Sequence, residues 1–308
     1  MPGNLFIEVG TRIRSRSGIY YRILQFLGAG GNSVVFLVLA LGGRYYGVLF
    51  ALKVFTKLSS TRRLEQFEQE TEFLRKCDHP SIMRLFDSGV YTDRSKAQAT
   101  KYPFVVVEYL PESLHGLIRG APMTTAERVS HTLQLLSALA YLDQSNPPVI
   151  HRDIKPKNIF VKGQSCVLGD FGLMKFLNQD DGTDREIYGD RARTGMPFFY
   201  RTPDLVAYLR EGTPLTTKTD IFQLGLVVAE TFTGWNPEIS AESMADPVDL
   251  ERLKFIPGAL GTRIRGLIES MLEPEPSRRP SAADLMDPWE GVFHEVVDRC
   301  HQLNGRVF

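Results

Sequence analysis

Hydrophobic positions in the first part of the chain fall mainly in short β-branched runs, separated by glycine-rich or polar stretches. Runs of this length and composition are typical of β-strands. The strands predicted in this way are Tyr20–Gly28, Val34–Ala40, Val48–Thr56, Met83–Val90 and Tyr102–Leu110. Leu64, Phe67 and Leu74 recur at helical spacing among charged residues, which predicts one helix over Thr61–Cys77. The polar stretch Tyr91–Lys101 is expected to form an exposed hairpin loop.

The pattern becomes mainly helical in the rest of the chain. A capping signal at Thr124 predicts a helix that continues through Leu142. Further buried helices are predicted at residues 220–233 and 261–273, and short strands at Ile159–Val161 and Cys166–Leu168. The expected fold class is therefore α+β, with a smaller strand-rich part that contains one helix and a larger part that is mainly helical.

Composition and charge exclude several classes of protein. The 308 residues include 36 Lys or Arg and 36 Asp or Glu, so the formal net charge is zero and no nucleic acid partner is expected. The three cysteines are too scattered for a disulfide framework or a structural zinc site. The longest apolar run, Val34–Leu41, is too short to span a membrane, and no secretory signal is visible. We expect a cytoplasmic protein, whose oligomeric state the sequence leaves open.

A glycine-rich stretch, Gly28-Ala29-Gly30-Gly31, lies between the first two predicted strands. Glycines in such a place let backbone N–H groups approach phosphates closely, although ordinary turns between strands are also rich in glycine. A dinucleotide-binding fold requires a helix directly after the glycines. A strand follows here, so that fold is disfavoured.

Polar residues interrupt the apolar pattern at three further places. Lys53 has apolar neighbours in a predicted strand, so it either points to water or is buried with a partner such as Glu70, seventeen residues further on. The stretch His151-Arg152-Asp153-Ile154-Lys155-Pro156-Lys157-Asn158 concentrates charged and amide groups on a backbone stiffened by proline. Asp170-Phe171-Gly172 follows Asp153 by seventeen residues, with a predicted strand pair between them.

This ordered set of motifs resembles the eukaryotic-type Ser/Thr protein kinase family, from about Tyr20 to Pro280. Three later stretches resemble the closing motifs of that family: Tyr200-Arg201-Thr202-Pro203-Asp204, Asp220-Ile221-Phe222-Gln223-Leu224-Gly225 and Pro276-Ser277-Arg278-Arg279-Pro280. The start of the chain is similar to stand-alone bacterial members. The resemblance implies an N-terminal extension (1–19), an antiparallel-sheet N-lobe (20–110), a helical C-lobe (111–300) and a C-terminal tail (301–308).

The resemblance also implies a set of residues that bind ATP. These are Gly28, Gly30, Gly31, Ser33, Val35, Ala51, Lys53, Glu70, Val107, Glu108, Leu110 and Phe160. The glycines would cover the phosphates, with Ser33 in place of the family's third glycine. Apolar side chains of the set would sandwich the adenine, Val107 would lie behind it, and the segment from Glu108 to Leu110 would bind its edge. Lys53, held by Glu70, would contact the phosphates.

The implied chemistry is transfer of a phosphoryl group to a Ser or Thr hydroxyl of a protein substrate. Asp153 would orient the hydroxyl as the base, and Lys155 would contact the transferred group. Asn158 and Asp170 would bind Mg²⁺, with Mn²⁺ as an alternative. His151 is expected to be a packing residue that stacks on Phe171, Leu74 and Leu85, and not an acid or base.

Two departures from the family pattern bear on specificity and regulation. The segment 194–200 lacks a clearly placed substrate-contacting threonine, and Asp204 stands where a glutamate is usual, with Arg279 as its predicted buried partner. Arg152 is implied to receive a phosphate on the activation segment, for which Thr194 and then Thr183 are the first acceptors.

Two other functions remain open from the sequence alone. A pseudokinase that serves as a binding or scaffold module would usually lack one of the four residues Lys53, Asp153, Asn158 and Asp170, all of which are present. A kinase of small molecules would typically lack the closing motifs around Asp204 and Arg279.

Overall fold

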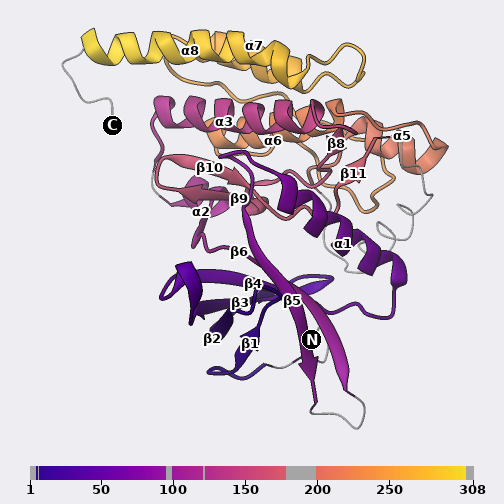
Figure 1. The fold of residues 1–308 in the computed structure, drawn as a ribbon. Helices are drawn as coiled ribbons and strands as arrows, with labels where there is room; N and C mark the ends of the chain where they lie inside the picture. Colours follow the sequence, from indigo (N-terminus) through magenta and orange to yellow (C-terminus); the bar gives the residue numbers. More distant parts are fainter. Residues whose placement is uncertain (1–4, 6, 95–98, 121, 178–198, 303–308) are drawn as a thin grey trace. The chain divides into compact units, whose positions relative to one another are not determined.

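The computed structural model describes residues 5, 7–94, 99–120, 122–177 and 199–302. The chain forms two compact units, Met1–Pro111 and Glu112–Phe308. The ribbon in Figure 1 follows the chain through the elements of each unit. Thr183 and Thr194, predicted as regulatory residues, lie outside the described residues. None of the helices that are described is both long and apolar enough to cross a bilayer.

The first unit contains a six-stranded antiparallel sheet. Its strand order is β1 (Arg12–Arg14), β2 (Tyr20–Ala29), β3 (Ser33–Ala40), β4 (Leu49–Phe55), β6 (Thr100–Glu108) and β5 (Leu85–Asp93). A short 3₁₀ helix (Gly43–Tyr45) precedes β4. The stretch 1–19, expected as an extension, contributes β1, in which Ile13 is buried between two exposed arginines.

The hairpin between β5 and β6 is longer than the apolar pattern predicts. Pairing continues through Tyr91↔Tyr102 to Asp93↔Thr100, inside the stretch that was expected to be a loop. The prediction was wrong here because a hairpin ladder is stabilised by backbone hydrogen bonds, which do not require apolar side chains.

The two faces of this sheet bury different side chains, as the period of two along a strand requires. Val34, Phe36 and Val38 of β3 belong to one core, with the even-numbered residues of β4 and β6. The opposite face carries Val105, which packs with Phe67 of α1 (Thr61–Lys76). The helix therefore covers the same sheet face to which the odd-numbered positions of β3, β4 and β6 belong.

The second unit is mainly helical, as predicted. Its helices are α2 (Leu114–Arg119), α3 (Thr125–Asp143), α5 (Pro203–Glu211), α6 (Lys218–Thr233), α7 (Gly261–Met271) and α8 (Ala282–Gln302). Its strands are β7 (Glu112–Ser113), β8 (Val149–Ile150), β9 (Ile159–Lys162), β10 (Ser165–Leu168) and β11 (Lys175–Phe176). They form the small sheets β10-β9-β7 and β11-β8.

The helices of the second unit pack in layers, with α3 and α6 side by side and α7 and α8 covering them (Figure 1). α3 begins with a complete capping box between Thr124 and Glu127, which confirms the predicted start. Almost every residue of α6 is buried, as expected for a helix whose middle part is mostly apolar. α6 is therefore a core element on which loops of this unit can be fixed.

Candidate active site

The glycine-rich turn connects β2 to β3 in the first unit. The amide of Gly30 donates to the Ser33 carbonyl at 2.8 Å. A Cβ added at Gly28 or Gly31 would meet nothing within 4 Å, and one at Gly30 would meet only the Ser33 oxygen, at 3.9 Å. None of the three glycines has a positive φ. Neither sterics nor backbone conformation within this unit therefore requires glycine, so the open space fits a ligand that approaches the backbone.

Register places the predicted ATP-binding side chains of the sheet on one face. Val35 of β3 lies opposite Lys53 of β4, and Ala51 lies opposite Val107 of β6. These positions belong to the face away from the main apolar core, on the side where α1 packs. Val35 and Val107 are partly exposed. The arrangement presents one polar and several apolar groups on a common surface.

Lys53 and Glu70 form a largely buried ion pair. The Lys53 Nζ lies 2.9 Å from a carboxylate oxygen of Glu70, and the two side chains are 17% and 6% exposed. Glu72, on the same helix, instead pairs on the surface of α1 with Arg75 and Lys76. Burial of Lys53 with Glu70 as its partner, one of the two possibilities that the sequence left open, is therefore confirmed.

Of three further predicted residues, two lie at the end of β6 or just beyond it, and one lies in the second unit. Glu108 is the last residue of β6, and its amide donates to the Arg84 carbonyl at 3.3 Å. Leu110 is partly exposed just beyond that strand. Phe160, in the second unit, is a partly exposed residue of β9 that pairs with Val167 of β10.

Asp153 is the centre of a compact polar cluster in the second unit. Both of its carboxylate oxygens lie 2.9 Å from the Lys155 Nζ. The Asn158 amide donates to the Asp153 backbone carbonyl and to one carboxylate oxygen, each at 2.9 Å. The Asp153 residue is only 8% exposed. Three predicted site residues are thus brought together, and the carboxylate is held in a defined orientation by charge-assisted hydrogen bonds.

The backbone around Asp153 is fixed by two side chains of α6. The Asp220 carboxylate accepts hydrogen bonds from the amides of His151, at 2.7 Å, and Arg152, at 2.9 Å. Gln223, one turn further, accepts from the amide of Ile154 at 2.9 Å and donates to the Arg152 carbonyl at 3.1 Å. Asp220 and Gln223 stood within the same recognised motif, but the sequence did not predict their contacts with this loop. The available signal was this polar pair, three residues apart, within the otherwise apolar stretch 220–229 of the helix.

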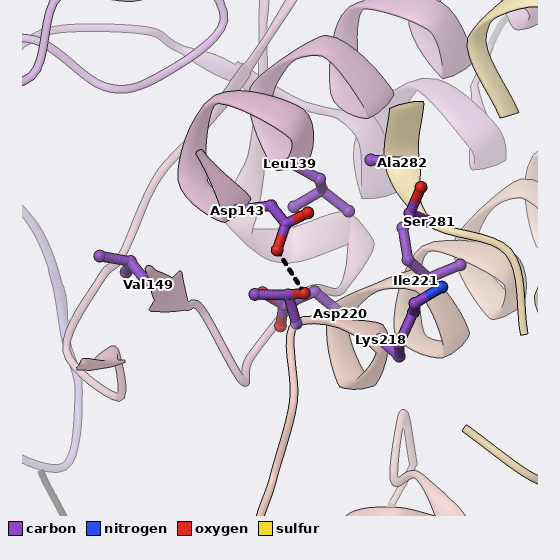
Figure 2. A pocket seen from close by; sticks show the side chains of 9 residues that line it. Leu139, Asp143, Val149, Lys218, Asp220, Ile221, Ser281 and Ala282 are labelled. Atoms are coloured by element: carbon purple, nitrogen blue, oxygen red, sulfur yellow. Dashed lines mark hydrogen bonds between the residues drawn. The ribbon is translucent and has the colours of Figure 1, made fainter. Parts of the chain in front are cut away.

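The surroundings of Asp220 include a small pocket, and Figure 2 draws the side chains that line it. The pocket beside it has a volume of only about 10 Å³, which leaves room for about one water molecule. The dashed line is the hydrogen bond from Thr217 to Asp143, of 2.6 Å. Burial raises the pKa of Asp220 to about 7, although the amide donors oppose that rise. Asp220 supports the loop from this position, and the pocket beside it is too small for a substrate.

His151 is fully buried and packs edge-on against Phe171. The ring centroids are 4.5 Å apart at an interplanar angle of 70°. Its Nε2 lies 3.1 Å from the Gly169 carbonyl and must donate, while Nδ1 accepts from the Asp153 amide at 3.3 Å. Burial lowers the pKa of His151 to about 4. The predicted packing role against Phe171 is confirmed; Leu74 and Leu85 belong to the other unit.

Asp170 follows β10 in a left-handed backbone conformation, with φ at 56°. Its side chain is exposed, whereas the next residue, Phe171, is buried. The Gly169 amide donates to the Asn158 carbonyl at 2.9 Å, which links the loops that carry Asn158 and Asp170. The described residues contain no cluster of three or more His, Cys, Asp or Glu side chains suited to a metal. Two oxygen ligands suit Mg²⁺ that is also bound by phosphates.

Arg152, predicted to receive a phosphate, is 3% exposed and has a positive φ of 66°. Its guanidinium donates to the Leu173 carbonyl at 2.6 Å and to the Met174 carbonyl at 3.5 Å. It therefore holds the chain just after Asp170-Phe171-Gly172. Its predicted phosphate acceptors, Thr183 and Thr194, lie outside the described residues.

The predicted pair between Asp204 and Arg279 is confirmed. Their closest oxygen and nitrogen atoms are 3.4 Å apart, and the side chains are 5% and 0% exposed. Arg279 also donates to the carbonyls of Lys218, Glu273 and Pro274, which satisfies most of its donors. Aspartate is therefore long enough for this pair, although it is one methylene shorter than the usual glutamate.

A second buried ion pair was not predicted. Arg201 Nε lies 3.0 Å from a carboxylate oxygen of Glu238, and the side chains are 1% and 0% exposed. Glu238 also accepts from the amides of Tyr200 and Arg201. Burial raises the pKa of Glu238 to about 7, against the opposing effect of Arg201. Glu238 lies in an irregular segment after α6, where no periodic pattern in the sequence marks a partner.

The fold, the Lys53–Glu70 pair and the polar cluster around Asp153 together define the protein kinase class. The family described as protein kinase domain matches residues 21–289. The chain belongs to the protein kinase family and has its α+β fold, with a sheet-rich N-terminal unit and a helical C-terminal unit.

Curated relatives include several proteins named Ser/Thr kinases. "Serine/threonine-protein kinase Nek3" of Oryza sativa subsp. japonica is 31% identical over 86% of this chain and 43% of its own length. "Serine/threonine-protein kinase chk-2" of Caenorhabditis elegans is 31% identical over 87% of this chain and 55% of its own length. "Mitogen-activated protein kinase kinase kinase 5" of Arabidopsis thaliana is 30% identical over 74% of this chain and 30% of its own length. The chain thus spans about half the length of the first two relatives.

Proposed function

We propose that this protein transfers the γ-phosphoryl group of ATP to Ser or Thr hydroxyls of protein substrates. The observation that carries the proposal is the cluster in which Lys155 and Asn158 fix the carboxylate of Asp153. A substrate hydroxyl oxygen forms a bond to the γ-phosphorus as the bond to the bridging oxygen of ADP breaks. Asp153 accepts the hydroxyl proton, and ADP leaves with the electron pair of the broken bond.

Lys155 supports a Ser/Thr acceptor within this proposal. Its ammonium lies 2.9 Å from both carboxylate oxygens of Asp153, so it is adjacent to the atom that receives the proton. A cation at that position also stabilises charge that develops on the transferred phosphoryl group. In the resembling family, a lysine two residues after the aspartate is typical of kinases that act on Ser and Thr.

ATP is the proposed phosphoryl donor. The glycines of the turn after β2 leave space for its phosphates, and Lys53, oriented by Glu70, supplies a positive charge for them. The remaining proposed contacts are Ser33, Val35, Ala51, Val107, Glu108, Leu110 and Phe160. Alanine at position 51 is small and lies on the same face as Lys53, which suits a planar ring against the sheet.

Asn158 and Asp170 fit a hard divalent cation, Mg²⁺ or Mn²⁺. The Asn158 Nδ2 is used by Asp153, which leaves its amide oxygen for a cation, and Asp170 contributes an exposed carboxylate. When bound, the cation neutralises negative charge on the phosphates. Asn158 and Asp170 would hold that cation next to the Asp153 carboxylate.

Regulation by phosphorylation of the activation segment is part of the proposal. A phosphate on Thr194, or on Thr183, would bring about −1.5 to −2 charge and strong acceptor oxygens toward Arg152. Arg152 already holds the carbonyls of Leu173 and Met174, so a phosphate there would act at the start of the same segment. Alanine substitution of both threonines tests this: full activity of the double variant would overturn it.

The test of the function uses the full chain with Mg²⁺-ATP and a mixture of general protein acceptors, such as casein and histones. Mass spectrometry of the products is expected to find phosphoserine or phosphothreonine. Asp153→Asn should lower the turnover at least a hundredfold, whereas the exposed variant Glu72→Gln should retain it. ATP binding without transfer would indicate a binding module, and transfer only to metabolites would indicate a small-molecule kinase; either outcome would overturn the proposal.

A further inference from the structure

A second cavity lies within the helical unit, away from the cluster around Asp153. Its volume is about 300 Å³, at the lower end of the range for small-molecule sites. It is formed at the start of α3, the end of α6, the start of α7, the end of α8 and the loop before α7. The residues that line it are Thr124, Thr125, Ala126, Arg128, Phe232, Ile256, Pro257, Gly258, Ala259, Leu260, Ile264, Val296 and Arg299.

The wall of this cavity is mainly apolar and carries a positive charge. Ile256, Leu260, Ile264 and Val296 supply aliphatic side chains. The lining residues include two arginines but neither aspartate nor glutamate. A ligand complementary to such a wall has a hydrocarbon body and a single negative group.

Arg128 gives the cavity a cation that forms no direct ion pair within the part of the chain that the structure describes. Its Nε is buried, with no hydrogen-bond partner in the part of the chain that the structure describes. The neighbouring carboxylate, that of Glu127, is engaged by the amide and the hydroxyl of Thr124, at 2.6 and 2.8 Å. Burial lowers the pKa of Arg128. Glu127 acts on Arg128 only as a nearby charge, so the half-buried guanidinium beside the cavity has no direct ion pair among the described residues.

The ring of Phe232 holds this guanidinium in place. The Arg128 Cζ lies 5.7 Å from the ring centroid, within the range of a cation–π contact. Phe232 also packs against Trp289, whose buried Nε1 has no partner among the described residues. The cation is thus positioned by an aromatic ring in the core of this unit. A fixed guanidinium loses little freedom when it binds a carboxylate.

We propose that this cavity binds a medium-chain carboxylate, an aliphatic body with one terminal anionic group. The carboxylate would balance Arg128, with Arg299 at the exposed side, and the chain would contact the aliphatic wall. A neutral molecule of the same shape would leave the guanidinium unbalanced. The site does not depend on the phosphotransfer proposed above.

The first test is calorimetric titration of the full chain with octanoate and with 1-octanol, its uncharged counterpart. Octanoate is expected to bind at least tenfold more tightly. Arg128→Met should abolish that preference without changing the affinity for octanol. The matched control is Arg265→Met, because Arg265 lies on α7, pairs with Glu269 and does not line the cavity. Equal affinities of the two ligands for the unaltered chain, or an unchanged preference in Arg128→Met, would overturn the proposal.

A second variant tests the location independently of Arg128. Ala259 lines the cavity and is exposed, so a larger side chain there can fill the cavity without crowding the core. Ala259→Trp should reduce octanoate binding at least tenfold, with an unchanged melting temperature. Full binding by this variant would place the ligand elsewhere and overturn the site. If Arg128→Met fails to fold, Ala259→Trp and the comparison of octanoate with octanol still decide the question.

Discussion

Arg279 is completely buried, and its guanidinium is surrounded by the Asp204 carboxylate and three backbone carbonyls. Glu238 and Arg201 form a similar pair. Each pair removes two charges from water, so its members depend on one another far more than surface pairs do. The same holds for Lys53 and Glu70, where the fixed geometry serves the proposed contact with phosphates.

Arg279→Met is expected to lower the free energy of unfolding by about 3–5 kcal/mol, because it leaves the Asp204 carboxylate buried without its cation. Denaturant unfolding monitored by circular dichroism measures this change. The matched control is Arg278→Met, since Arg278 is the exposed neighbour and should change stability by less than about 0.5 kcal/mol. Similar effects of the two substitutions would contradict the assigned role of the pair.

Glu70→Gln is expected to lower kcat/KM for the proposed phosphotransfer about 10²–10³-fold, because an amide no longer fixes the Lys53 ammonium. Kinetics with Mg²⁺-ATP and a protein acceptor give this ratio. The variant keeps the shape of the side chain, so the fold should be retained. Glu72→Gln on the exposed part of the same helix should keep the activity of the unaltered chain.

His151 makes stability depend on pH in a direction that follows from its burial. Its pKa is about 4 in the folded state, below the ordinary value near 6.5. The unfolded chain therefore takes up a proton first as the pH falls through 6.5, and stability is lost between about pH 6.5 and 4. When the pH is lowered from 7.5 to 5, His151 should reduce the free energy of unfolding of the unaltered chain by about 2 kcal/mol. The test is denaturant unfolding of the unaltered chain and of His151→Phe at pH 7.5 and at pH 5. The variant should lose about 2 kcal/mol less stability between the two pH values. An equal loss in both proteins would contradict the role of His151.

Helices and strands with strong periodicity were predictable from the sequence, and those with mixed signals were not. α3, α6 and α7 were found because their apolar positions recur at helical spacing or fill the whole helix. α8 was missed because Pro288 interrupts its pattern, although the helix continues through it. β1 is too short to establish an alternation. Local pattern is informative where burial is regular, and it fails where distant packing decides the conformation.

α6 combines core packing with the support of the loop around Asp153. Gln223→Leu should leave the Ile154 amide and the Arg152 carbonyl without their partners. A loss of about 1–3 kcal/mol in unfolding free energy is expected for each buried group left unsatisfied. Because the loop also carries Asp153, kcat should fall more than KM changes. Measurement of both stability and steady-state kinetics checks this; a stability loss with an unchanged kcat would mean that the loop keeps its position without Gln223.

The whole chain divides its proposed tasks between its two units. The glycine-rich turn and the ion-paired Lys53 belong to the first unit, and the cluster around Asp153 belongs to the second. Motif order in the sequence predicted this division and most of the candidate site. It did not predict the loop contacts of Gln223, the pairing of Glu238 with Arg201 or the cavity beside Arg128, because each depends on which distant segments meet in the folded chain. The predicted regulatory threonines lie outside the described residues.

The open space around the glycine-rich turn implies that glycine there lowers the stability of the protein while it favours binding of ATP. A residue with a side chain would fit at Gly28 without steric conflict and would restrict the unfolded chain more than glycine does. Gly28→Ala is therefore expected to raise the free energy of unfolding by about 0.4–1 kcal/mol while it weakens ATP binding. Thermal unfolding with and without Mg²⁺-ATP separates the two effects. The variant is expected to be more stable than the unaltered chain without nucleotide and to be stabilised less by Mg²⁺-ATP. That result would show that glycine at this position lowers stability and keeps the backbone accessible to the nucleotide.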